Sequence, residues 1–184
     1  MDCKHRIKEN DWNNIIREKK IGSIDENITF KIIDYKSLVL NVTNPNFKNE
    51  LENLTSMYRE RTISYNQYFI DTIMNNFDNS YYIFLFENEK IIGMTRAGVR
   101  SKKVEISMVF LLKKYRSKGY AFQMLNNFIE FLKIQEDVLK IGLSVLKSNL
   151  SAYNLYKKIN FQVECENYED IFKEILIYMY LDNF

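Results

Sequence analysis

The segment from Lys113 to Ala121 brings together the residue types that proteins use to bind phosphate oxygens. Its lysines and its arginine supply charged N–H donors. Gly119 lets the backbone approach a ligand closely, and Ala121 leaves the following turn uncrowded. A helix that begins here would add backbone N–H groups and a partial positive charge. The segment therefore has the chemistry of a pyrophosphate-binding loop.

The flanking residues predict a strand before this loop and a helix after it. Val104–Leu112 has the pattern of a strand, and Ala121–Lys133 places apolar residues at helical spacing. Ile141–Leu146 is the next predicted strand. A helix that connects two strands of one sheet makes a right-handed crossover, so these two strands are expected to lie parallel. Ligands of such sheets bind at the carboxyl ends of strands and at helix N-termini.

Further strands are predicted on both sides of this unit. Tyr81–Phe86 and Ile91–Val99 are expected to form a hairpin around a turn at Glu87–Lys90. The last predicted elements are a short helix and two strands, at Ser151–Ile159, Phe161–Cys165 and Ile175–Leu181.

The first 35 residues are predicted to be an extension that precedes a domain of residues 36–184. The extension would hold a short helix, capped at Asn10 or Asp11 and ending near Gly22, and then a strand at Ile28–Ile33. The domain would open with a strand and two helices, at Leu38–Val42, Phe47–Tyr58 and Tyr65–Phe77.

Composition indicates a globular chain and excludes several classes of function. The 184 residues are 46% apolar and 15% aromatic, enough for a sizeable core. The 26 basic and 24 acidic residues leave a formal charge of +2. So small a net charge does not indicate the strongly basic surface that binding of duplex nucleic acid requires. His5 is the only histidine and no CxxC is present, so no metal site is expected. No apolar run approaches the roughly 20 residues of a membrane span, and no signal core follows the N-terminus. A cytoplasmic protein is predicted.

Two segments resemble the GNAT superfamily of N-acetyltransferases. Arg116-x-x-Gly119-x-Ala121 matches the family's acyl-CoA signature, Arg/Gln-x-x-Gly-x-Gly/Ala, and lies between a predicted strand and helix as that signature does. Asn149–Phe161 is similar to the family segment Asn-x-x-Ala-x-x-x-Tyr-(Glu/Lys)-Lys-x-Gly-Phe. Asn160 replaces the usual glycine, but asparagine tolerates the left-handed conformation of a helix end. Lys113 stands where a proline is common.

The resemblance implies a fold and a co-substrate. The expected fold is α/β, with a mixed, mostly antiparallel twisted sheet, helices on both faces, and a splayed parallel strand pair that holds acyl-CoA. Acetyl-CoA would be the acyl donor, and its phosphates would contact the signature loop, Arg116, Ser117, Lys118, Gly119, Tyr120 and Ala121. The backbone of Val109, Phe110 and Leu111 would bind the acyl carbonyl and the pantetheine arm, and Asn149 and Tyr156 would also contact the co-substrate.

The resemblance also implies catalytic roles for Tyr156 and Glu105. Tyr156 would protonate the departing thiolate. Glu105 is the candidate base, and it is expected to share a strand face with Ser107, Val109 and Leu111 because side chains alternate along a strand. Other family members deprotonate the amine through water, so that alternative stays open.

Each assignment has a simpler alternative. Asn149 fits the N-cap of the helix that follows it, and both roles are compatible. Tyr156 lies on an apolar helix face and fits ordinary core, while Glu105 fits a solvated strand residue. Four acidic residues are assigned to the loop between the last strands, where they would attract a cationic amine or simply face solvent; they are Glu164, Glu166, Glu169 and Asp170.

The predicted function is transfer of an acetyl group from acetyl-CoA to a primary amine by direct attack on the thioester. The acceptor would be a small-molecule or peptide amine, and a homodimer is left open. The main alternative is a non-catalytic acyl-CoA-binding regulatory module on the same fold. A nucleotide-binding domain is disfavoured because neither G-x-x-x-x-G-K-[ST] nor G-x-G-x-x-G is present. Acylation of transfer RNA is neither required nor excluded by the near-neutral charge.

Overall fold

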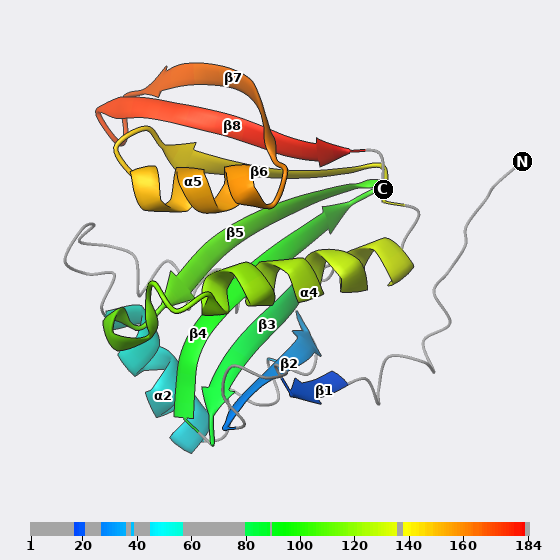
Figure 1. Cartoon of the computed structure of the whole chain (residues 1–184), viewed down its shortest axis with the longest axis vertical. Helices are drawn as coiled ribbons and strands as arrows, with labels where there is room; N and C mark the ends of the chain where they lie inside the picture. The colour runs from blue at the N-terminus through cyan, green and yellow to red at the C-terminus, as the bar shows by residue number, and fades with distance from the viewer. Residues whose placement is uncertain are drawn as a thin grey trace, which may run out of the picture.

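A computed structural model describes residues 17–20, 27–35, 38, 45–56, 80–88, 90–135 and 138–182. These residues form an eight-stranded sheet in the order β1-β2-β3-β4-β5-β6-β8-β7, with helices on both of its faces (Figure 1). Neighbouring strands are antiparallel, except that β5 and β6 are parallel. The predicted mixed, mostly antiparallel sheet with one parallel pair is confirmed.

The elements follow one another in this order. Strands β1 (Arg17–Lys20) and β2 (Ile28–Asp34) come first, followed by helix α2 (Pro45–Ser56). The middle of the sheet is formed by β3 (Ser80–Glu87), β4 (Lys90–Arg100) and β5 (Lys103–Leu111). The 3-10 helix η1 (Lys113–Tyr115) precedes α4 (Tyr120–Gln135). The last elements are β6 (Lys140–Leu146), α5 (Leu150–Lys158), β7 (Gln162–Glu169) and β8 (Glu174–Asp182).

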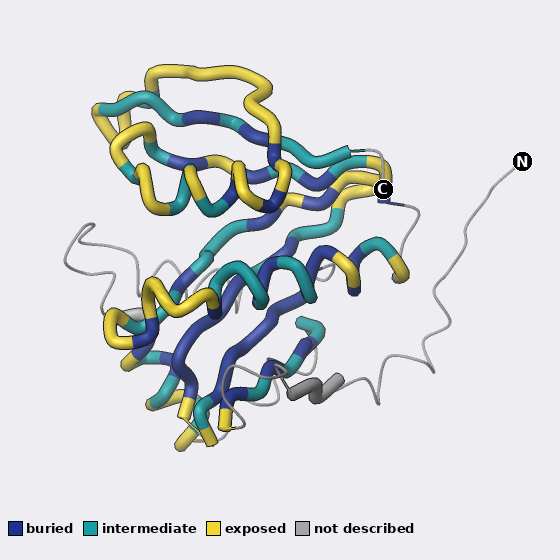
Figure 2. Tube along the Cα trace, viewed as in Figure 1, coloured by how far each residue is buried: buried dark blue, intermediate teal, exposed yellow. Residues whose placement is uncertain are grey.

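Apolar residues pack on both faces of the sheet. On one side, here called the α4 face, α4 and α5 cover a cluster that includes Leu85 and Phe128. On the other side, the α2 face, α2 covers a smaller cluster that includes Phe84 and Met94. Strand β3 is buried along nearly its whole length because it contributes to both clusters, whereas β7 is exposed (Figure 2). No helix in the described part of the chain is long and apolar enough to cross a membrane.

Two predictions for the N-terminal part are wrong where the structure describes it. The helix expected to end near Gly22 does not include Arg17–Lys20, which is a strand because it pairs with Thr29–Ile32 of β2. Leu38, expected to begin a strand, is helical and fully buried among the apolar residues of the α2 face. A short apolar run fits either element, and packing decides between them. The division of the chain at residue 36 stays a prediction.

The other predicted elements within the described residues are confirmed, with boundaries shifted by a few residues. The strand at Ile28–Ile33 is β2, and the helix that begins near Phe47 is α2. The hairpin turn lies at Asn88, whose φ of 55° is left-handed. The helix predicted at Tyr65–Phe77, and the part of the first predicted helix that precedes Arg17, lie outside the described residues.

Gly93 should be required for close packing of β4 against the end of β5. A Cβ atom at Gly93 would lie 2.9 Å from the backbone oxygen of Phe110 and 2.8 Å from Leu111 Cδ1. Gly93→Ala should therefore lower the free energy of unfolding, measured with urea, by about 1–3 kcal/mol, as overpacking does. Gly142→Ala is the matched control because its Cβ would meet only backbone oxygens at 3.8 and 3.9 Å. Equal stabilities for the two variants would contradict this account.

Candidate active site

Strands β5 and β6 separate at their carboxyl ends. Their parallel pairing joins Lys103–Ile106 to Lys140–Leu143, a register of four residue pairs. Beyond it, β5 continues to pair with β4, and β6 continues to pair with β8. The backbone groups that would extend the parallel ladder face the opening instead. Such an opening at the carboxyl ends of strands is where ligands of α/β sheets bind.

A β-bulge in β5 lies beside this opening. Arg96 of β4 pairs with Ser107, whereas Met94 pairs with Phe110, so β5 holds one more residue than β4 between these two pairs. Met108 adopts a φ of 55°, and the buried Thr95 hydroxyl donates to the carbonyl oxygen of Ser107 at 3.0 Å. An extra residue of this kind interrupts the alternation of side chains along a strand.

The bulge corrects the predicted position of Glu105. Val109 and Leu111 pack against the α4-face cluster. Val104 and Ile106 belong to the same cluster, so Glu105 and Ser107, which alternate with them along β5, project from the opposite face. The expectation that Glu105 shares a face with Val109 and Leu111 is therefore wrong, because strict alternation does not continue through Met108.

The loop that follows β5 has the conformation expected of an anion-binding turn. Ser117 and Gly119 have φ values of 62° and 84°, and α4 begins at Tyr120. A Cβ atom at Gly119 would meet nothing within 4 Å, so the glycine serves the backbone conformation and leaves open space above it. Arg116 Nε donates to the carbonyl oxygen of Leu111 at 2.9 Å, which ties the loop to the end of β5.

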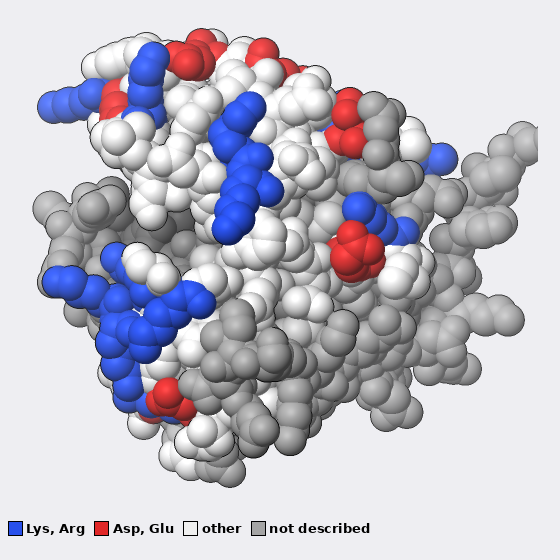
Figure 3. Space-filling model, in the orientation of Figure 1, with Lys and Arg blue, Asp and Glu red and all other residues white. Residues whose placement is uncertain are grey.

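Positive charge gathers at this loop. Lys113, Lys114, Arg116 and Lys118 are all exposed, and Figure 3 shows the blue side chains concentrated where the loop lies in Figure 1. The first turn of α4 adds backbone N–H groups and the positive end of the helix dipole. The combination suits a ligand with several phosphate oxygens.

Tyr115 anchors the loop, and the sequence pattern did not identify it. Its ring is buried, and its hydroxyl donates to a carboxylate oxygen of Glu87 in the β3–β4 hairpin. The ammonium groups of Lys114 and Lys118 lie 4.5 and 5.8 Å from the ring centroid. Burial and the hydrogen bond to Glu87 both raise the pKa of the Tyr115 hydroxyl. The only indication in the sequence that Tyr115 anchors the loop was its position, as an aromatic residue within a run of basic residues.

The second predicted segment lies across the opening, on α5. The side-chain oxygen of Asn149 accepts a hydrogen bond from the backbone N–H of Ala152 at 3.3 Å, so the N-cap role is confirmed. That role uses only the amide oxygen, and the amide nitrogen carries two further donors. Tyr156 is 6% exposed and packs edge-on against Phe161, with ring centroids 6.1 Å apart. It is therefore part of the core of the α4 face.

Asn160 takes the conformation predicted for it. Its φ is 74°, and its backbone N–H donates to the carbonyl oxygen of Lys157 at 3.0 Å. The next residue, Phe161, donates its N–H to the carbonyl oxygen of Tyr156 and is fully buried. An asparagine thus ends α5 where the family pattern has glycine.

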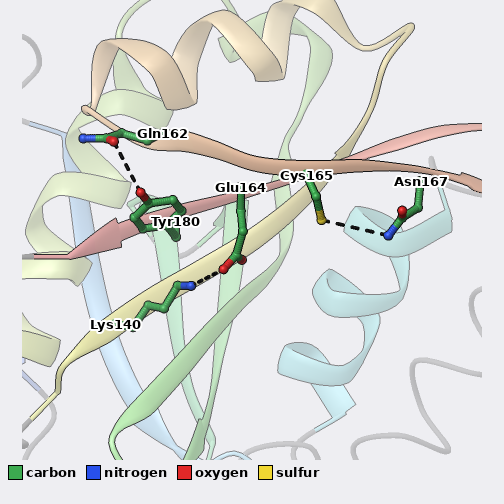
Figure 4. Close-up of polar contacts among 6 residues, drawn as sticks. All are labelled: Lys140, Gln162, Glu164, Cys165, Asn167 and Tyr180. Atoms are coloured by element: carbon green, nitrogen blue, oxygen red, sulfur yellow. Dashed lines mark hydrogen bonds and ion pairs between the residues drawn. The ribbon is translucent and has the colours of Figure 1, made fainter.

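The acidic residues near the end of the chain do not form a loop. Glu164, Glu166 and Glu169 belong to β7, which is longer than predicted, and only Asp170 lies in the following turn. Glu164 forms an ion pair with Lys140 (Figure 4), and Glu166 forms one with Lys147 at 2.8 Å. Lysines therefore offset two of these charges. The attraction of a cationic amine to this edge stays a prediction.

The model of the acetyltransferase (GNAT) family matches residues 49–161, more than half of the chain. The match includes the signature loop, Asn149 and Tyr156. A comparison with curated protein sequences finds no significant match.

Several solved structures share the fold. The ribosomal-protein-S5-alanine acetyltransferase of Vibrio fischeri superposes with a TM-score of 0.62 at 14% identity, over 86% of this chain and 94% of that one. An N-acetyltransferase of Campylobacter jejuni gives 0.58 at 21% identity, over 84% and 98%. A Bacillus subtilis acetyltransferase, solved in complex with CoA, gives 0.54 at 20% identity, over 62% and 84%. At these identities the likeness shows the fold alone.

Removal of the Tyr115 hydroxyl should weaken the anchor of the loop. Tyr115→Phe is expected to lower the free energy of unfolding near pH 7 by about 1 kcal/mol, the typical contribution of one hydrogen bond. Because folding raises the pKa of Tyr115 from its ordinary value of 10.0, the protonated hydroxyl contributes stability below pH 10. This contribution is lost as the pH rises through the folded-state pKa.

Unfolding measured between pH 7 and pH 11 should therefore show a steeper alkaline loss for the native sequence than for Tyr115→Phe. The exposed Tyr168, changed to phenylalanine, is the control and should leave both quantities unchanged. Parallel curves for the native sequence and Tyr115→Phe would show that the hydroxyl does not hold the loop.

Proposed function

The chain belongs to the acetyltransferase (GNAT) family, and we propose that it transfers the acetyl group of acetyl-CoA to a primary amine by direct attack on the thioester. As a member of this family it is an acyl-CoA-dependent acetyltransferase. The observation that carries the finer proposal is the junction of the β5–β6 opening with the basic loop at the start of α4. The opening would hold the thioester carbonyl of acetyl-CoA, and the basic loop would hold the phosphates at the other end of the same molecule.

The residues at this junction fit the proposed donor. The backbone N–H groups of Ser117, Lys118, Gly119, Tyr120 and Ala121 lie at or beside the beginning of α4, where phosphate oxygens are favoured. Arg116 and Lys118 add charged donors. The space above Gly119 leaves room for a phosphate. Val109, Phe110 and Leu111 would supply backbone donors to the thioester carbonyl, and the Asn149 amide would bind the pantetheine arm.

The two faces of the sheet separate the proposed substrates. The loop, α4 and α5 lie on one face, whereas Glu105 projects from the other. With the donor entering from the α4 face, an amine reaches the carbonyl from the α2 face, on which Glu105 lies. Glu105 is three residues before Met108, about 10 Å along a strand. It is therefore proposed to remove the proton of the ammonium group through a water molecule.

Each proton has a proposed destination. An alkyl ammonium has a pKa near 10.4, so the amine must lose a proton before it attacks. That proton passes toward Glu105, and backbone donors at the bulge stabilise the oxyanion, commonly the largest catalytic effect. When the carbon–sulfur bond breaks, the Tyr156 hydroxyl would protonate the thiolate. The cytoplasmic location and the homodimer remain predictions from the sequence.

Calorimetric titration with acetyl-CoA tests the donor site. The native protein should bind acetyl-CoA with micromolar affinity, and Gly119→Glu should abolish binding because the positive φ, the bulk and the charge all oppose it. Asn167→Glu, the same one-unit charge change at an exposed position of β7, is the control and should bind normally. No binding at millimolar acetyl-CoA by a folded protein would contradict the transferase proposal.

Turnover by substituted enzymes tests the two proton-transfer residues. Glu105→Gln should lower kcat about 10²–10⁴-fold, since a positioned base contributes that much. Tyr156→Phe should lower kcat because the thiolate loses its proton donor. An unchanged kcat in either variant would remove that residue from the mechanism. Binding without turnover of any amine would favour the regulatory module.

A further inference from the structure

The turn between β6 and α5 holds Asn149 in a defined backbone conformation. Asn149 has φ and ψ values of −84° and 64°, and the backbone N–H of Leu150 donates to the carbonyl oxygen of Ser148 at 2.9 Å. Together these features describe an inverse γ-turn, whose central residue has φ and ψ of about −75° and +65°. The Asn149 side chain leaves the centre of this turn, so its direction depends on how Ser148 is held.

Glu174, the first residue of β8, holds Ser148 at two atoms. Its Oε1 accepts a hydrogen bond from the backbone N–H of Ser148, and its Oε2 accepts one from the Ser148 hydroxyl at 2.9 Å. The preceding N–H, of Lys147, donates to the backbone oxygen of Ile175 at 2.9 Å. Any residue at position 175 supplies that backbone acceptor, whereas the two contacts with Ser148 depend on the carboxylate. Figure 1 shows the start of α5 below the end of the sheet at which β7 turns into β8.

The carboxylate of Glu174 is not needed to pair the strands. Glu174 lies opposite Glu169 in the register of β7 and β8. Like charges directly opposite each other on antiparallel strands are destabilising. Glu169 accepts a separate hydrogen bond, from the Tyr178 hydroxyl at 2.9 Å. An uncharged residue at position 174 would remove the repulsion, so what the carboxylate contributes is its pair of hydrogen bonds to Ser148.

We propose that Glu174 is a positioning residue of the acetyl-CoA site, which holds Ser148 so that the amide nitrogen of Asn149 is directed at the pantetheine arm. This inference rests on the proposed function, in which Asn149 binds that arm. The amide oxygen of Asn149 already accepts from the N–H of Ala152 at 3.3 Å, so the first turn of α5 fixes one end of the amide. The two N–H donors at the other end are then oriented before the co-substrate binds, which lowers the entropic cost of binding.

The effect of Glu174 is confined to one part of the co-substrate. Ser148 lies two residues past the end of β6, at the edge where the strands separate, whereas the phosphates are proposed to bind at the basic loop before α4. Loss of the Glu174 carboxylate should therefore weaken contacts with the pantetheine arm and leave those with the phosphates. Removal of a negative charge would by itself favour every polyanion. Weaker binding of acetyl-CoA thus distinguishes an effect of orientation from an effect of charge.

Calorimetric titration with two ligands tests the proposal. One ligand is acetyl-CoA, and the other is adenosine 3′,5′-bisphosphate, which carries phosphates but lacks the pantetheine arm. Glu174→Gln should raise the Kd for acetyl-CoA about tenfold, as the loss of one oriented hydrogen bond does. The Kd for the bisphosphate should stay the same. Glu130→Gln, the same substitution at an exposed position of α4, is the control and should leave both constants unchanged.

Substitutions in the turn show whether Glu174 acts through Asn149. Ser148→Ala removes the hydroxyl contact and should also weaken acetyl-CoA binding, whereas Ser148→Thr keeps a hydroxyl and should retain it. Asn149→Asp keeps an oxygen that caps α5 but removes the N–H donors. In the Asn149→Asp background, Glu174→Gln should therefore have no further effect on the Kd for acetyl-CoA.

Three results would overturn the proposal. They are an unchanged acetyl-CoA affinity in both Glu174→Gln and Ser148→Ala, an equal loss of affinity for the two ligands, and additive effects of Glu174→Gln and Asn149→Asp. An equal loss for both ligands would show that Glu174 only stabilises the fold. Failure of the native protein to bind acetyl-CoA is a distinguishable result, because it removes the proposed function itself.

Discussion

The site depends on one extra residue in β5. Because β5 holds an additional residue opposite Thr95, the strand bends at Met108 and leaves β6 after four parallel pairs. The bend places backbone groups at the opening, turns Val109 and Leu111 toward α4, and leaves Glu105 on the opposite face. The Thr95 hydroxyl, which bonds the Ser107 carbonyl, supports this geometry inside the core. The same bulge thus opens a candidate ligand site and determines which side chains of β5 lie on each face of the sheet.

The phosphate loop is fixed from two directions. The Arg116 side chain bonds the end of β5, and the Tyr115 hydroxyl bonds Glu87 in the neighbouring hairpin. Exposed basic residues alone would pay a large entropic cost to converge on a ligand. Here the backbone that carries them is held by the part-buried Tyr115–Glu87 hydrogen bond and by the Arg116 side chain, so the donors are oriented before a ligand arrives. Preorganisation of this kind improves binding by lowering its entropic cost.

The sequence allowed most of the catalytic half of the fold to be predicted, because its signals are local. A basic loop before an amphipathic helix, and an asparagine seven residues before Tyr156, are readable from spacing alone. The face of Glu105 was not predictable, because a bulge depends on pairing with β4 and has no signature in Ile106–Phe110. Arg17–Lys20 and Leu38 were misassigned for a related reason, since distant partners set their structure.

The basic residues and the candidate base of the site lie on different faces of the sheet. The basic loop lies on the α4 face, where it would attract a polyanionic donor, whereas Glu105 lies on the α2 face. The ion pairs of Glu164 and Glu166 with lysines reduce the competing attraction of the β7 edge for simple cations. Within the described residues, the two faces of the sheet therefore separate the Glu105 carboxylate from a polyanionic ligand at the basic loop.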